Sequence, residues 1–205
     1  MLAQYNFALG IFILITSGIT GAILILAPGS IRLQRPDCGW VGWAFNIMNL
    51  LFFLLIIPIC GLMMMTGGEF PFLLCVNIPG GTIKIIIETL GLIFFLAGSL
   101  LLLWSRLSLR WSFRLGGVRP SQSDYLTMHG PYKHIRHPMY LSALLVLFGL
   151  TLILCSLLGA LMFAFMLVLI QKLIPEEEKQ LDQAYPMAYA EYCRRVPGKI
   201  WPRYR

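Results

Sequence analysis

Charge is scarce in this 205-residue sequence: only 12% of its residues are charged, while 58% are hydrophobic. Soluble domains carry about 25% charged residues, so a soluble fold could not bury this much apolar surface. The five cysteines are scattered and form no CxxC pair, which argues against a disulfide framework or a zinc knuckle. Lipid is therefore the expected surrounding of most of the chain.

A positive N-terminal region is also missing, because residues 1–6 contain no Lys or Arg. A cleaved signal peptide would need such a region and a shorter apolar core. The run 7–26 is about 20 residues long, enough to cross a hydrocarbon core of ~30 Å. We therefore expect a first membrane span that is retained.

Four further apolar runs predict an all-α, polytopic membrane protein with about five transmembrane helices. The predicted spans cover residues 7–26, 41–65, 82–104, 139–155 and 158–174. The last two share one apolar stretch that would be roughly 50 Å long as a single helix, so a tight hairpin is expected between them. Residues 1–205 are read as one integral membrane domain: 1–104 hold three spans, and 105–205 hold the hairpin, a connector and a polar tail.

The basic residues predict the orientation of these spans. Apart from Lys84, every Lys and Arg lies in the loop 32–35, the segment 105–139 or the tail from 172. The net charge of +7 therefore follows membrane topology and does not form a nucleic-acid-binding face. The positive-inside rule places the N-terminus outside, and the 105–139 segment and the C-terminus in the cytosol.

Smaller features carry structural expectations. Pro58 should interrupt the second span, and the small-residue pairs at 17/21 and 18/22 should allow close helix packing. Lys84 and Glu88, four residues apart, are expected to form an ion pair that stabilises helix packing. The alternative is that the pair forms a functional site within the membrane. Arg106, Arg110 and Arg114 read as a solvated basic stripe facing lipid headgroups.

All three histidines fall within residues 129–140, HGPYKHIRHPMY. Pro138 is a suitable first residue for the fourth span, with His137 as its cap. The unpaired N–H groups at that helix start would form an anion site, and Arg136 would add a fork that matches carboxylates. The histidine spacing matches no zinc pattern, so no metal is expected.

Acidic residues should meet this cluster. Pro175 and the acids at 176–178 resemble the start of a new helix just beyond the fifth span. Since the last two spans are hairpin neighbours, their cytosolic ends must lie close together. A carboxylate there could hold a ribose diol, or the acids could only complement the helix dipole.

Three stretches together carry a resemblance to a known family: residues 129–140, the acidic run EEKQL at 177–181, and YAEYCRRVP at 189–197. Residues 120–202 resemble the isoprenylcysteine carboxyl methyltransferase family, whose wider group includes phospholipid N-methyltransferases. The resemblance implies a membrane enzyme that uses S-adenosylmethionine and releases S-adenosylhomocysteine. It also implies a cytosolic cofactor pocket formed by the 105–140 connector and the C-terminal tail.

The resemblance assigns residues to that pocket. Glu177 matches the acid that holds the cofactor, and Arg136 and Glu177 are the expected catalytic residues. The other expected cofactor contacts are Asp124, Tyr125, Leu126, Thr127, His129, Tyr132, His137, Pro138, Met139 and Tyr140. Leu173 stands where eukaryotic relatives have an Arg that is thought to serve the acceptor. No glycine-rich turn has the setting found in soluble, doubly wound methyltransferases.

The implied reaction is methyl esterification of the carboxylate of a prenylated cysteine. Two alternatives stay open: methylation of a phospholipid headgroup amine, and a membrane scaffold or transporter without enzymatic activity. A carboxylate acceptor needs no proton removed, so a histidine base would be required only for an amine or hydroxyl acceptor. The expected partners are the lipid bilayer and a lipid-tailed acceptor, with no nucleic acid.

Overall fold

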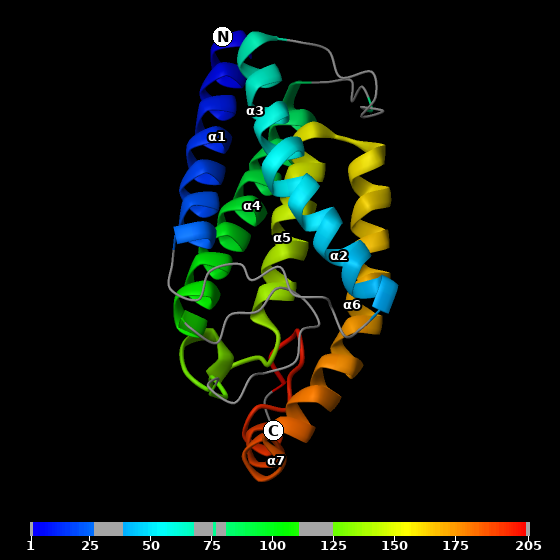
Figure 1. Cartoon of the computed structure of the whole chain (residues 1–205). Coiled ribbons are helices and arrows are strands. Elements are labelled where there is room, and N and C mark those ends of the chain that lie inside the picture. The colour runs from blue at the N-terminus through cyan, green and yellow to red at the C-terminus, as the bar shows by residue number, and fades with distance from the viewer. Residues whose placement is uncertain (1, 27–38, 68–75, 77–80, 111–124, 204–205) are drawn as a thin grey trace.

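A computed structural model describes residues 2–26, 39–67, 76, 81–110 and 125–203 (Figure 1). Within these residues all regular structure is helical, as the apolar runs predict. The elements are α1 (Leu2–Leu26), α2 (Gly39–Leu51), η1 (Phe52–Ile56), α3 (Ile57–Thr66), α4 (Gly81–Leu109), η4 (Gly130–Lys133), α5 (Pro138–Leu154), α6 (Leu157–Ala184) and α7 (Pro186–Arg195). The start of α1 and the C-terminus lie at opposite ends of the molecule.

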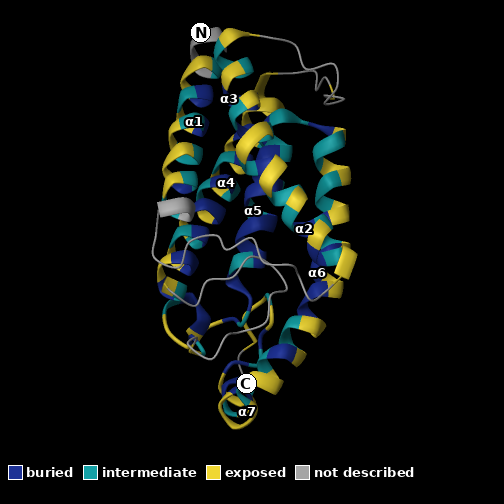
Figure 2. Ribbon diagram, in the orientation of Figure 1, coloured by how far each residue is buried: buried dark blue, intermediate teal, exposed yellow. Residues whose placement is uncertain are grey.

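Long apolar helices make this an integral membrane protein. In the described residues, four candidate spans are long and apolar enough to cross a bilayer: Asn6–Ile23, Gly39–Thr66, Gly81–Leu109 and Leu157–Ala184. The predicted fourth span is the shorter apolar helix α5, with 17 residues. Each predicted span is therefore a helix, and the all-α polytopic fold is confirmed. Exposed residues follow the outer faces of the helices (Figure 2), as expected where lipid replaces water.

The second predicted span changes its helical geometry at its middle. Residues Phe52–Ile56 form a π-helical turn, and Pro58 stands in the first turn of α3. A proline lacks the N–H that an α-helix interior requires, and a π turn is a common place where the helical pattern adjusts. The helical hydrogen-bonding pattern thus changes just before Pro58, the residue expected to interrupt this span. This change lets α3 pack against α1 while α2 packs against α6.

Close helix packing centres on glycines, although not those that the sequence predicted. A Cβ atom on Gly149 of α5 would lie 2.6 Å from the carbonyl oxygen of Gly91 on α4, so only glycine allows this approach. Gly10 of α1 is equally close to the backbone of α3. The predicted packing role of Gly18 and Gly21 was wrong, because nothing lies within 4 Å of a Cβ at either position.

A tight hairpin joins α5 to α6, as predicted. Cys155 adopts a left-handed conformation (φ 46°), and Ser156 caps α6 by accepting a hydrogen bond from the Gly159 N–H at 3.0 Å. The prediction that Pro175 starts a new helix was wrong, since α6 continues through Pro175 to Ala184. The polar residues 176–184 therefore extend the fifth span as one rod beyond the apolar core.

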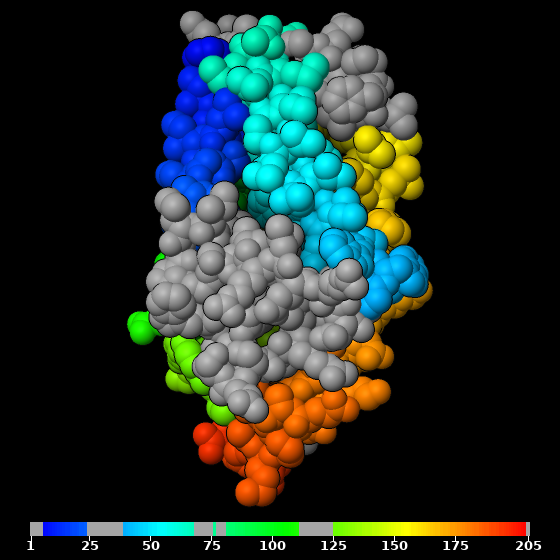
Figure 3. All heavy atoms as spheres, in the orientation of Figure 1, coloured from blue at the N-terminus to red at the C-terminus, as the bar shows by residue number. Residues whose placement is uncertain are grey.

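Exposed tryptophans mark the polar end of the helix bundle. Trp40 and Trp43 on α2, Trp104 on α4 and Trp201 in the C-terminal segment are all exposed. The Lys172 ammonium lies 5.5 Å from the centre of the Trp40 ring, so the start of α2 and this part of α6 share one level. Such aromatic side chains favour the membrane interface. The end of α6 and α7 project beyond them (Figure 3).

The Lys84–Glu88 pair is present, with 3.7 Å between the ammonium and a carboxylate oxygen. Glu88 is buried and Lys84 is half-exposed, as expected for a lysine that reaches outward from a helix end. Arg106 contradicts its prediction as a solvated residue, because its side chain is fully buried and donates to the carbonyl oxygen of Arg110 at 3.2 Å. Arg114 lies outside the described residues.

Candidate functional site

The start of α5 is held by the C-terminal segment. His137 stands at the N-cap position and Pro138 is the first helical residue, as predicted. The backbone N–H groups of Arg136 and His137 donate to the carbonyl oxygens of Gly198 and Lys199 at 3.0 and 2.9 Å. The His137 side chain makes no capping bond to the helix, so it is available for contacts with α6.

Those contacts bring the acids to the cap. His137 Nδ1 lies 3.4 Å from Glu177 Oε2, and His137 Nε2 lies 3.3 Å from Glu178 Oε1. The predicted convergence of the histidine cluster and the acidic run is therefore confirmed. Burial of the imidazole would lower the pKa of His137, but hydrogen bonds to Glu177 and Glu178 outweigh it and raise the pKa above its usual 6.5.

Glu178 is the centre of a larger ion-pair network. Its Oε1 accepts hydrogen bonds from Arg136 Nε and Nη2 at 3.0 and 2.8 Å, and its Oε2 lies 2.6 Å from Lys199 Nζ. Arg136 Nη1 also donates to the carbonyl oxygen of Val196 at 2.7 Å. One carboxylate thereby connects α6, the α5 cap and the C-terminal segment.

This network gives Arg136 a contact that the sequence did not predict. Its guanidinium fork, expected to face the carboxylate of a ligand, faces Glu178 instead. The catalytic assignment of Arg136 stays a prediction, and its observed contacts favour a role in positioning Glu178. Glu177 is less enclosed: 29% of its side chain is exposed, against 15% for Glu178.

Two of the predicted tyrosines flank the cap. The Tyr140 ring stacks on His137 at 5.7 Å between centroids, and its edge meets Phe45 of α2 at 5.2 Å. Tyr132 is buried in η4, and its carbonyl oxygen accepts a hydrogen bond from the Tyr192 hydroxyl of α7 at 2.7 Å. His137 therefore links Tyr140 to Glu177, so that one small ligand could contact both.

The predicted connector residues lie at different depths. Asp124 lies outside the described residues, while Tyr125 and His129 are exposed. Leu126 packs against the Tyr189–Tyr192–Val196 cluster. Thr127 is buried, and its hydroxyl has no hydrogen-bond partner in the described part of the chain. A buried hydroxyl in that state is a position where a ligand could bind.

A tight turn follows the connector. Gly130 has a φ of 61°, and a Cβ there would collide with the Ser108 side chain of α4. Only glycine satisfies both requirements at this position. The turn places η4 against the end of α4 that is predicted to face the cytosol, and it leads directly to Tyr132.

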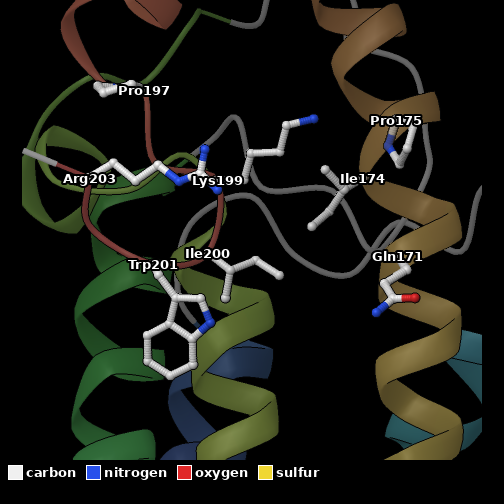
Figure 4. Close-up of a pocket in the computed structure, with 8 residues that line it drawn as sticks. All are labelled: Gln171, Ile174, Pro175, Pro197, Lys199, Ile200, Trp201 and Arg203. Carbon is white, nitrogen blue, oxygen red and sulfur yellow. The ribbon is translucent and has the colours of Figure 1, made fainter. Parts of the chain in front are cut away.

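A cavity of about 400 Å³ lies between α6 and the C-terminal segment (Figure 4). Its walls contain none of the predicted cofactor residues. They are formed by Gln171, Ile174, Pro175, Pro197, Lys199, Ile200, Trp201 and Arg203. Lys199 belongs both to this cavity and to the Glu178 network, so the two sites adjoin.

Comparison with known proteins assigns the chain to a family. The family model described as "Phospholipid methyltransferase" matches residues 86–188, which include most of α4, all of α5 and α6, and the start of α7. The chain belongs to the phospholipid methyltransferase family. It is therefore a membrane methyltransferase at the level of the family, and the resemblance found in its sequence is confirmed.

A curated relative is named for a more specific reaction. Protein-S-isoprenylcysteine O-methyltransferase B of Arabidopsis thaliana is 30% identical over 116 residues, which cover 56% of this chain and 59% of the relative. The chain thus spans less than two-thirds of that relative's length. The family match contains Arg136, His137, Tyr140, Glu177 and Glu178; Lys199 and the other cavity residues of the C-terminal segment lie beyond it.

Sequence reasoning missed three contributors to the site. Glu178 was overlooked beside Glu177, although the acidic run offered both. Lys199 and Tyr192 had no local signal, because their partners lie 21 and 60 residues away in the chain. In the described residues no three His, Cys, Asp or Glu side chains come together as metal ligands; the expectation that no metal binds stays a prediction.

Proposed function

We propose that this membrane methyltransferase uses S-adenosylmethionine to methyl-esterify the carboxylate of an isoprenylated cysteine. The observation that carries the proposal is the contact of His137 with both Tyr140 and Glu177 at the first turn of α5. The name of the curated relative favours the carboxylate acceptor. S-adenosylhomocysteine would be the product of the cofactor.

The residues present fit the proposed cofactor. The first turn of α5 presents backbone N–H groups, such as that of Met139, that could bind a carboxylate. Glu177 is placed to accept hydrogen bonds from a ribose diol. The buried hydroxyl of Thr127 could donate to the ligand, and the backbone of 125–127 would line the pocket beside Tyr132, with His129 and Pro138 at its edges. When bound, the cofactor supplies a methyl group already activated on a sulfonium.

The chain's own task is then alignment and exclusion of water. The carboxylate oxygen of the acceptor would take the methyl group that the bound cofactor supplies, and the electron pair of the broken carbon–sulfur bond would stay with sulfur. No proton is removed in this exchange. A carboxylate acceptor therefore requires no general base from the chain.

The site is proposed to face the cytosol. Arg136, Lys172, Lys179 and Lys199 gather at this end of the molecule, and the positive-inside rule assigns such an end to the cytosolic side. The start of α1, at the other end, would then lie outside. The cofactor would enter from the cytosol and the lipid-tailed acceptor from the bilayer.

Methyl transfer from labelled S-adenosylmethionine tests this proposal. Purified protein in lipid should methylate N-acetyl-S-farnesylcysteine and give a base-labile product, as expected of a methyl ester. Phosphatidylethanolamine is the second acceptor to test, because the description of the matching family favours a phospholipid. A base-stable product on that lipid, with none on the prenylated cysteine, would replace the proposed acceptor.

A further inference from the structure

The cavity between α6 and the C-terminal segment has the features of a site for an anionic amphiphile. Its volume of about 400 Å³ falls in the usual range for ligand pockets, ~300–1,000 Å³. Ile174, Ile200 and Trp201 supply apolar walls, while Lys199 and Arg203 supply cations. Figure 4 shows the C-terminal side chains facing Gln171, Ile174 and Pro175 of α6 across the cavity.

The charge of the cavity is not balanced internally. None of the eight described lining residues is acidic. Lys199 is neutralised by Glu178 at 2.6 Å, whereas no carboxylate among the described residues pairs with Arg203. Arg203 therefore leaves a positive charge at the rim, and a guanidinium binds a carboxylate through two parallel hydrogen bonds.

A proline gives the cavity a hydrogen-bond acceptor as well. Pro175 lies inside α6 and has no N–H, so the carbonyl oxygen of Gln171 lacks its usual helical donor. Both residues line the cavity. An amide N–H of a ligand could bond to that carbonyl oxygen, and the Gln171 side chain offers further polar contacts.

The exposed apolar face of α6 leads from the membrane to this cavity. Leu161, Phe165 and Val168 are exposed on successive turns, and Gln171 and Pro175 continue the same face into the cavity wall. An apolar chain lying along this face would stay in lipid while its head reached the cavity. The head would then lie next to the network that holds Glu177 and His137.

We propose that this cavity binds the head of the lipid-tailed acceptor and that Arg203 binds its carboxylate. The proposal rests on the proposed methyl esterification, and it adds the subsite and the residue that select an anionic acceptor. Leu173, at the position where the family resemblance implies an arginine that serves the acceptor, is fully buried and apolar. Arg203 supplies the missing guanidinium from a different part of the chain.

Arg203→Ala should raise the KM for N-acetyl-S-farnesylcysteine roughly ten- to hundred-fold, the loss typical of a charge-assisted hydrogen bond. The affinity for S-adenosylhomocysteine, measured by calorimetry, should not change. Arg203→Lys should restore part of the acceptor affinity. Arg194→Ala is the matched control, because Arg194 is an exposed residue of α7 that pairs with Glu191 and lies outside the cavity.

A neutral analogue of the acceptor separates recognition from structure. The carboxamide of N-acetyl-S-farnesylcysteine should bind the unmodified protein much more weakly than the carboxylate form of the same compound does. Arg203→Ala should remove this difference in affinity. Equal KM values in Arg203→Ala and Arg194→Ala would overturn the cavity assignment while leaving the proposed function intact. Failure of the unmodified protein to methylate the prenylated cysteine, despite binding S-adenosylhomocysteine, would overturn the proposed function itself.

Discussion

Glu178 should be the residue whose change most weakens the polar end of this protein. Glu178→Gln keeps the shape of the side chain but removes the charge that holds Arg136, His137 and Lys199. Arg136 would then stay as a buried cation, since its side chain is only 8% exposed. Desolvated charges without a partner are costly.

The loss of stability expected for Glu178→Gln can be estimated from the contacts of Glu178. Breaking a buried pair on one side costs about 3–5 kcal/mol, which applies to Arg136 with its two hydrogen bonds to Glu178. The Lys199 pair adds about 0–1 kcal/mol, because half of the Lys199 side chain is exposed. In a protein of this size about 1 kcal/mol shifts Tm by about 2–4 °C, so Glu178→Gln should lower Tm by roughly 6–24 °C.

Thermal unfolding in detergent, followed by tryptophan fluorescence, measures this shift. Glu191→Gln is the matched control, because Glu191 pairs with Arg194 and Arg195 on the exposed surface of α7 and should have little effect. A double change of Glu178 and Arg136 to Gln should cost less than the two single changes together, since it leaves no unpaired charge between them. Equal melting of Glu178→Gln and Glu191→Gln would refute the role of the network.

Three further results are expected. Glu177→Gln should weaken S-adenosylhomocysteine binding by about ten-fold in calorimetry, the usual loss for a charged hydrogen bond, whereas Glu176→Gln should not; equal affinities would misplace the pocket. Because the pKa of His137 is raised in the folded protein, its protonation stabilises the fold below about pH 6.5, and this stabilisation is lost as pH rises through the raised pKa. His137→Gln should therefore reduce the fall of Tm with rising pH above about pH 6.5. An unchanged dependence of Tm on pH would contradict this prediction. Gly149→Ala should lower the free energy of unfolding by about 1–3 kcal/mol, because the added methyl group overpacks α4 against α5. Gly18→Ala, where the methyl group would meet open space, should not destabilise the protein. Similar Tm values for the two variants would argue against the close approach of α4 and α5.

The sequence by itself determined where the helices lie and where α5 begins. Apolar runs must form helices in a bilayer because every backbone N–H and C=O has to be paired within the segment. Pro138 fixes a helix start locally, since its ring sets φ and its missing N–H costs nothing in the first turn. The hairpin then required the ends of α5 and α6 to meet, which predicted the convergence of His137 with the acidic run.

Only the tertiary structure decided which acid meets which cation and where α6 ends. Glu178, not Glu177, receives Arg136 because α6 continues as one helix through Pro175, and this continuation fixes the rotation of the acidic residues. The C-terminal segment adds Lys199 and the rim of the cavity through contacts distant in sequence. The burial of Arg106 has the same origin. The sequence shows that the residue is charged, but only the packing of other segments around it decides whether its side chain contacts water.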